Sequence, residues 1–217
     1  MAIYSTILFD LDGTLTDPKE GITKSAQYAL SRLGIDEPDL EELTSFIGPP
    51  LHVSFEQFYG LGPSEVERAV MYYRQNYKES GIYENVIYDG IPELLKFLKD
   101  KSKQLVIATS KLTVFAEQIL VHFEIDQYFD HVVGSNLDGS RSNKAEIVEH
   151  AIRKFNGSPK SDFIMVGDRK HDIVGANANG IDSIGVKYGY GSQEELVQAN
   201  ATHLVDTVDE LFNLLSP

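Results

Sequence analysis

Three aspartates lie within eight positions of the segment FDLDGTLTD, residues 9–17, directly after an apolar run. Like charges this close repel one another, and a buried carboxylate without a partner is costly to keep ionised. Asp10, Asp12 and Asp17 therefore belong either to a solvated turn or to a site where a cation compensates their charge. The polar residues elsewhere in the chain decide between these two interpretations.

Other polar side chains also follow apolar runs. Thr109 and Ser110 come after QLVIA, Asp168 and Asp172 follow FIMVG, and Lys144 begins a helical pattern after the loop GSNLDGSRSN. In an open α/β sheet, ligands bind at the carboxyl ends of the strands. We therefore expect these side chains to converge on a single site.

Phosphoryl transfer is the chemistry that this set of residues suits. Mg²⁺ prefers oxygen ligands, which Asp10, Asp168 and Asp172 could supply, and the ion would offset the repulsion between the carboxylates. Lys144 and the hydroxyl of Thr109 could stabilise the phosphoryl group during transfer. An aspartate can be the nucleophile, and a second acid two residues on could protonate the leaving oxygen and later activate water.

The elements that must position these residues follow from the apolar pattern. Four short apolar and β-branched runs predict buried strands, at residues 3–9, 104–108, 163–166 and 181–186. Helical patterns lie between them, with Ser142 as the expected cap of the helix that carries Lys144. Since strands and helices alternate from Tyr88 onward, the fold class predicted is α/β, a Rossmann-like parallel sheet with helices on both faces.

The segment from about residue 19 to residue 83 breaks this alternation. It has no convincing strand but several helical patterns, including an apolar stripe through Val66, Ala69 and Tyr73. This pattern indicates a helical insertion directly after the first strand of the α/β core. We expect an α/β core of residues 1–17 and 84–217, and a helical insertion of residues 18–83, which corresponds to the cap domain of the family that the motifs below resemble.

Composition excludes several classes of protein. The chain has 217 residues, no cysteine and a formal net charge of −14. Disulfides and zinc–thiolate sites are therefore excluded, and binding to nucleic acid or to an anionic membrane is not expected. No apolar run approaches the roughly 20 residues that span a bilayer, and the amino terminus does not look like a signal peptide, so we expect a cytoplasmic protein.

The motifs together resemble those of the haloacid dehalogenase superfamily of phosphohydrolases. FDLDGTLTD resembles the first motif, VIATSK the second, the lysine of SNKAEIV the third and MVGDRKHD the fourth, and all appear in family order. The helical insertion resembles the mobile cap of the branch that includes phosphoglycolate phosphatases, β-phosphoglucomutases and certain 5′-nucleotidases. The resemblance thus covers the chain from the first strand to about Gly180.

This resemblance implies a catalytic role for each matched residue. Asp10 would be the nucleophile, and Asp12 the general acid and base. Thr109, with Ser110 beside it, would bind the phosphoryl group, and Lys144 would stabilise both that group and Asp10. Asp17 has no assigned role.

The same resemblance implies a magnesium site. Asp10 and Asp168 would bind Mg²⁺ directly, Asp12 through its backbone carbonyl, and Asp172 directly or through water. Gly48, in the segment FIGPPL, lies where a loop of the cap reaches the substrate in this family. The loop Tyr188–Ser192 is expected to be a glycine-rich turn, and the roles of Arg169 and His171 are left open.

The function expected is that of a Mg²⁺-dependent phosphatase, which hydrolyses small phosphate monoesters through an aspartyl-phosphate intermediate. A phosphoglycolate-phosphatase-like enzyme is preferred, with a 5′-nucleotidase as the alternative. A β-phosphoglucomutase-type phosphotransferase, a phosphoacceptor switch and a catalytically silent binding protein are less favoured. The partner expected is a small phosphorylated metabolite, and the chain is expected to be a monomer or a homodimer.

Overall fold

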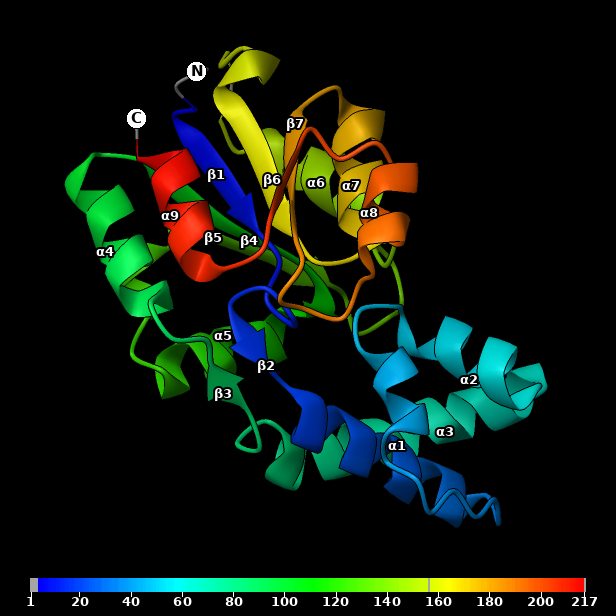
Figure 1. Ribbon diagram of the computed structural model, residues 1–217. Coiled ribbons are helices and arrows are strands. Elements are labelled where there is room, and N and C mark those ends of the chain that lie inside the picture. Colours follow the sequence, from blue (N-terminus) through cyan, green and yellow to red (C-terminus); the bar gives the residue numbers. More distant parts are fainter. Residues whose placement is uncertain (1–3, 156, 217) are drawn as a thin grey trace. The chain divides into compact units, whose positions relative to one another are not determined.

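The computed structural model describes residues 4–155 and 157–216. It divides into two compact units, one formed by the chain up to Asp17 and from Ile87 onward, the other by Pro18–Val86 (Figure 1). The second unit covers the segment expected to be the insertion, residues 18–83, and continues three residues beyond position 83. Along the described part of the chain, no helix is both long and apolar enough to cross a bilayer.

The first unit is built on a parallel sheet. Six strands of the described residues form it in the order β5-β4-β1-β6-β7-β8. They are β1 Thr6–Phe9, β4 Gln104–Leu112, β5 His131–Ser135, β6 Phe163–Gly167, β7 Asp182–Val186 and β8 His203–Val205. Every residue of β1 and β6 is buried, as expected for central strands covered on both faces. The predicted α/β fold is confirmed.

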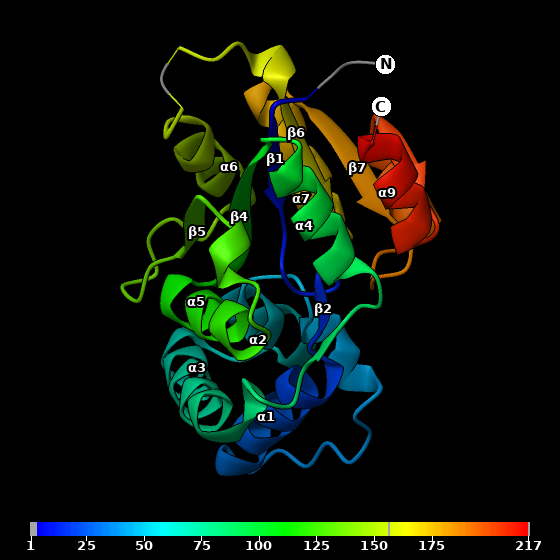
Figure 2. The ribbon, with the colours of Figure 1, turned by 90° about the vertical axis from the view of Figure 1, so that its left-hand side faces the viewer.

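Helices cover both faces of this sheet. They are α4 Ile91–Asp100, α5 Thr113–His122, α6 Lys144–Ile152, α7 Lys170–Asn179, α8 Gln193–Gln198 and α9 Val208–Leu215. Figures 1 and 2 show α6 and α7 on one face and α4 and α9 on the other. Ile147 of α6 belongs to the same buried cluster as Leu8 and Met165. On the opposite face, the rings of Phe97 and Phe212 bring α4 and α9 together at 4.8 Å.

The strand order reverses beside β1, which pairs with β4 on one side and β6 on the other. The chain builds the sheet outward from β4 to β5 and then returns to β6 on the other side of β1. In open α/β sheets, such a reversal leaves a crevice beyond the carboxyl ends of the strands. The side chains that follow β1, β4 and β6 therefore meet at this edge.

The prediction that the second strand ends at Ala108 was wrong. β4 continues to Leu112, and its register with β5 shifts between Ala108 and Leu112. Thr109 and Ser110 consequently lie inside the irregular end of the strand and do not follow it. Such irregularities redirect side chains that a regular pleat would alternate between the two faces.

The second unit is helical. It consists of α1 Lys19–Arg32, the 3₁₀ helix η1 Glu42–Phe46, α2 Leu51–Tyr59, α3 Pro63–Asn76 and the π-helical turn η2 Tyr77–Gly81. Two short strands that the sequence did not predict, β2 Thr16–Asp17 and β3 Val86–Ile87, pair where the chain passes between the units.

Candidate active site

The carboxyl ends of β1, β4 and β6 bring together four carboxylates and two lysines. They are Asp10, Asp12, Asp168, Asp172, Lys111 and Lys144. The sequence predicted five of the six as a group. All belong to the first unit, so the site is formed within that unit.

Three of the carboxylates form a tight buried cluster. Asp10, Asp168 and Asp172 each place one carboxylate oxygen within 4.8 Å of the others. Asp10 is 4% exposed, and the other two are fully buried. The backbone N–H of Leu11 donates to Asp10 Oδ1 at 2.8 Å, which fixes this carboxylate just beyond the end of β1.

Lys144 joins two of these carboxylates. Its Nζ lies 3.0 Å from Asp10 Oδ1 and 2.6 Å from Asp172 Oδ1, and it donates to the backbone oxygen of Ala108 at 3.0 Å. Burial alone would lower the pKa of Lys144, but the carboxylates of Asp10 and Asp172 outweigh it and raise the pKa above its ordinary value. Lys144 is therefore a charged residue, as the phosphoryl-binding role requires.

The helix start that carries Lys144 differs slightly from the prediction. The N-cap of α6 is Asn143, whose side-chain oxygen accepts a hydrogen bond from the N–H of Ala145 at 2.8 Å. The cap expected at Ser142 was wrong by one residue. Because Asn143 ends the loop, Lys144 is the first residue of the helix and its side chain extends back towards the sheet.

Asp172 makes a different contact with each of its two carboxylate oxygens. It lies in the first turn of α7, where its Oδ2 accepts a hydrogen bond from the N–H of Arg169 at 3.0 Å. Its other oxygen faces Lys144. Burial raises the pKa of Asp172 to about 6, and Asp10 adds to the rise while Lys144 opposes it.

Asp168 is held by donors from two loops. The N–H of Tyr190 donates to Asp168 Oδ2 at 2.8 Å, and the hydroxyl of Thr14 lies 3.4 Å from Oδ1. Burial raises the pKa of Asp168 well above its ordinary value, and the carboxylates of Asp172 and Asp10 raise it further. These groups together disfavour the ionised form of Asp168 unless a cation is bound nearby.

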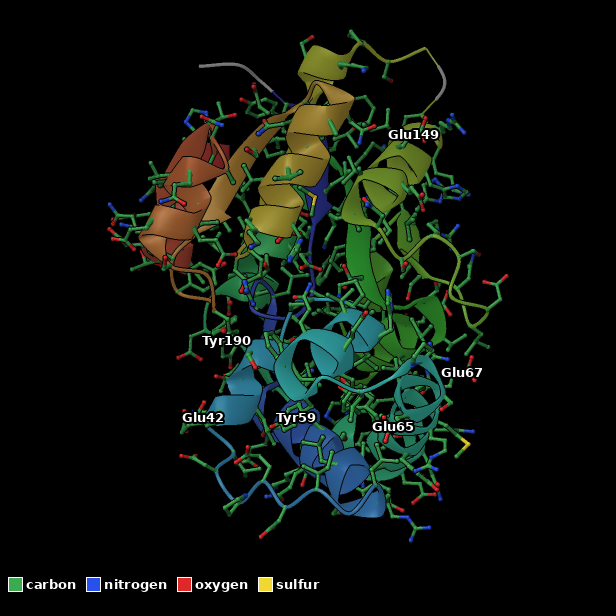
Figure 3. All side chains as sticks on the ribbon, turned by 90° about the vertical axis from the view of Figure 1, so that its right-hand side faces the viewer. Glu42, Tyr59, Glu65, Glu67, Glu149 and Tyr190 are labelled. Atoms are coloured by element: carbon green, nitrogen blue, oxygen red, sulfur yellow. The ribbon has the colours of Figure 1, made fainter. Side chains whose placement is uncertain are left out.

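The loop Tyr188–Ser192 packs directly against Asp168. A Cβ on Gly191 would lie 1.9 Å from the backbone oxygen of Asp168, and one on Gly189 would lie 2.4 Å from Asp168 Cβ. Tyr190, labelled in Figure 3, donates its hydroxyl to Asp17 Oδ1. The glycines therefore allow a contact with the acidic cluster that the sequence did not reveal, and Tyr190 joins Asp17 to the same loop.

Asp12 pairs with the lysine that the sequence analysis missed. Lys111 Nζ lies 2.8 Å from Asp12 Oδ2. Burial raises the pKa of Asp12, while Lys111 opposes the rise. Lys111 lies within VIATSK, so its place in that motif was the available signal, but a lysine after a strand is also common on surfaces.

The charges of this site fit a divalent cation. When all four carboxylates are ionised, they face two ammonium groups, which leaves two negative charges uncompensated among these residues. Buried charges of one sign need such compensation. Asp10, Asp168 and Asp172 present carboxylate oxygens, the ligands that hard divalent ions prefer. The side chain of Asp12 faces Lys111 and is not part of this triplet.

The remaining candidate residues are not part of the carboxylate cluster. Thr109 is buried, and its hydroxyl accepts a hydrogen bond from the N–H of Lys111 at 3.3 Å, with Ser110 half-buried between them. Gly48 belongs to the second unit. Arg169 pairs with Glu195, with 3.0 Å between Nε and Oε1. This ion pair favours a structural role for Arg169.

Comparisons with known proteins agree with this arrangement. Residues 7–186 match the family model described as haloacid dehalogenase-like hydrolase. A Pseudomonas aeruginosa protein named 5′-nucleotidase is 50% identical over 200 residues, which cover 92% of this chain and 90% of that protein. The tyrosine-protein kinase PtkA of Mycobacterium tuberculosis is 40% identical over 207 residues, covering 94% and 70%. A crystal structure described as a predicted phosphatase from Clostridium acetobutylicum has a TM-score of 0.95 and 48% identity, with 98% of both chains covered.

Proposed function

The chain belongs to the haloacid dehalogenase-like hydrolase family and is a phosphatase, and from this premise we propose that it is a Mg²⁺-dependent phosphomonoesterase with Asp10 as its nucleophile. The observation that supports this most is the contact of Asp10 with Lys144 inside the buried carboxylate cluster. A nucleophilic carboxylate has to approach an anionic phosphoryl group, so cationic groups beside it are a requirement of the reaction.

In the first step, a carboxylate oxygen of Asp10 attacks phosphorus. The bond between phosphorus and the ester oxygen breaks, and Asp12 gives its proton to that oxygen, so that the product leaves as a neutral alcohol. The raised pKa of Asp12, caused chiefly by burial, favours the protonated form that this step needs. The result is an aspartyl phosphate at Asp10.

In the second step, Asp12, now a carboxylate, takes a proton from water as the water oxygen attacks phosphorus. The bond between phosphorus and Asp10 breaks, inorganic phosphate leaves, and both aspartates return to their starting states. Thr109 and Lys144 donate to the phosphoryl oxygens throughout. Asp10, Asp168 and Asp172 would hold Mg²⁺, which supplies positive charge to the phosphoryl oxygens when bound.

We propose nucleoside 5′-monophosphates as the substrate class. The support is the 50% identity to the relative named 5′-nucleotidase, which extends over 92% of this chain. This order reverses the preference drawn from the sequence, where phosphoglycolate stood first. The cap residues around Gly48 are proposed to contact the part of the substrate beyond the phosphate, as the family resemblance implies.

Phosphate release from a panel of monoesters tests this proposal. The panel contains nucleoside 5′-monophosphates, 2-phosphoglycolate, hexose phosphates, phosphotyrosine and 4-nitrophenyl phosphate, each with and without Mg²⁺. The highest kcat/KM is expected for a nucleoside 5′-monophosphate, and Asp10→Asn serves as the control. Preference for another class would reject the substrate, and full activity of Asp10→Asn would reject the mechanism.

A further inference from the structure

Lys111 is a second buried lysine at the site, and the proposed reaction has not yet given it a task. It lies at the irregular end of β4, where its side chain is only 7% exposed. The hydroxyl of Thr109 accepts a hydrogen bond from its backbone N–H, which ties this part of the strand to a predicted phosphoryl-binding residue. Lys111 and Lys144 reach the site from different elements and contact different aspartates.

The ion pair with Lys111 involves only one of the two carboxylate oxygens of Asp12. Oδ2 lies 2.8 Å from the ammonium group. Oδ1 is buried and has no hydrogen-bond partner within residues 4–155 and 157–216. A buried acceptor without a partner is costly, and such atoms often belong to functional sites. One oxygen of Asp12 is thus held in place, and the other is available to a bound molecule.

We propose that Lys111 is a positioning residue, which holds Asp12 Oδ2 so that Oδ1 exchanges the proton with the ester oxygen and then with water. This inference rests on the proposed function, in which Asp12 is the general acid and base. In the first step, the proton on Oδ1 passes to the ester oxygen as the bond to phosphorus breaks. In the second step, Oδ1 takes a proton from the attacking water.

This role predicts a dependence on the leaving group that a purely structural role would not produce. An alkoxide needs a proton as it leaves, whereas 4-nitrophenolate leaves well without one. Loss of a positioned general acid therefore slows the first step for an alkyl ester and hardly affects it for the aryl ester. The parameter kcat/KM reports that first step, because it includes events only up to release of the alcohol.

The experiment compares Lys111→Met with wild type in the presence of Mg²⁺. The substrates are 4-nitrophenyl phosphate and whichever alkyl monoester of the panel wild type hydrolyses fastest. We expect kcat/KM to fall by about 10- to 100-fold for the alkyl ester, which is at most the lower end of the contribution typical of acid–base catalysis because Asp12 itself remains, and by less than about 3-fold for the aryl ester. Lys111→Arg is expected to restore most of the loss. A burst of 4-nitrophenol followed by slow turnover is also expected, since Asp12 assists the second step.

Two variants separate failure of this inference from failure of the proposed function. Lys99→Met removes a lysine charge from the ion pair with Asp130, away from the site. This variant is expected to keep the wild-type kcat/KM for both esters. Asp12→Asn is expected to show the same leaving-group dependence as Lys111→Met, only larger. If Asp12→Asn shows none, the proposed mechanism fails.

If Asp12→Asn shows the dependence and Lys111→Met does not, the role of Lys111 alone is rejected. If Lys111→Met loses kcat/KM equally on the two esters, or loses none on either, the role of Lys111 is also rejected. Thermal unfolding checks the fold of each variant. Lys111→Leu, which likewise has no hydrogen-bond donor in the side chain, provides the same comparison if Lys111→Met does not fold.

Discussion

The substitution Gly191→Ala tests whether the loop between β7 and α8 sets the position of Asp168. The added Cβ would lie 1.9 Å from the backbone oxygen of Asp168, whereas real Cβ atoms essentially never come within 3.0 Å of such a neighbour. The loop or Asp168 therefore has to move by about 1.1 Å. Neither side of this contact is a flexible side chain.

This displacement is large enough to break the hydrogen bond from Tyr190 to Asp168. The donor and acceptor are 2.8 Å apart, so a shift of about 1.1 Å along that direction separates them beyond hydrogen-bond range. Overpacking costs about 1–3 kcal/mol, and a lost hydrogen bond to a charged group about 1.5–3 kcal/mol. We expect the free energy of unfolding to fall by about 2.5–6 kcal/mol, which lowers Tm by roughly 5–24 °C for a chain of this size.

Thermal unfolding measures the loss of stability, and the Mg²⁺ requirement measures the displacement of Asp168. The Mg²⁺ concentration that gives half-maximal activity is expected to rise about 10-fold or more, as is typical when a partner of a metal ligand is lost. Gly62→Ala is the matched control, because the nearest atom to its added Cβ is 3.6 Å away and its φ of −71° suits alanine. If Gly191→Ala keeps both Tm and the Mg²⁺ requirement of wild type, the loop does not position Asp168.

Three further outcomes are expected. Lys144→Met leaves a buried charge pair broken and should lower the free energy of unfolding by about 3–5 kcal/mol without Mg²⁺, measured with urea; an unchanged midpoint would contradict the pairing. Burial raises the pKa of Asp168 and of Asp172, the latter to about 6, so the folded protein binds more protons than the unfolded chain between about pH 4 and pH 6. The free energy of unfolding of the metal-free protein should therefore fall as pH rises through this window, by about 3 kcal/mol for Asp172. Mg²⁺ should reduce this dependence on pH. A free energy of unfolding that does not change with pH in the absence of metal would refute the reasoning. Tyr190→Phe removes the hydrogen bond to Asp17 and should cost about 1 kcal/mol by the same urea assay, whereas no cost would show that this bond does not stabilise the fold.

The sequence was sufficient for the central strands and insufficient for the edges of the sheet. β1, β4, β6 and β7 are apolar runs, because central strands are buried on both faces. β8 was not predicted, since it is a three-residue strand at the edge of the sheet and is only partly buried. β2 and β3 have two residues each, too few for any periodicity to show.

Some residues of the candidate site could likewise be predicted from the sequence, and others could not. Asp10, Asp168 and Lys144 could be brought together from sequence, because topology alone sends residues after β1 and β6 to one edge. Lys111 depends on the register shift in β4, which has no simple sequence signal. The contact of Tyr190 with Asp168 is made by a backbone N–H, a group that every residue except proline has. Its only trace in the sequence was the pair of glycines on either side.

The measurement that tests the central claim most directly is chemical trapping of a phosphorylated Asp10. The Lys111→Met variant, for which a burst is expected, is mixed with 4-nitrophenyl phosphate and Mg²⁺ and quenched with acid during that burst. Treatment with borohydride follows, which reduces an acyl phosphate to an alcohol, and the peptides are then sequenced by mass spectrometry. The account predicts homoserine at position 10 and unchanged aspartate at positions 12, 168 and 172. An unmodified Asp10 in an enzyme that shows a burst, or homoserine at another position, would contradict it.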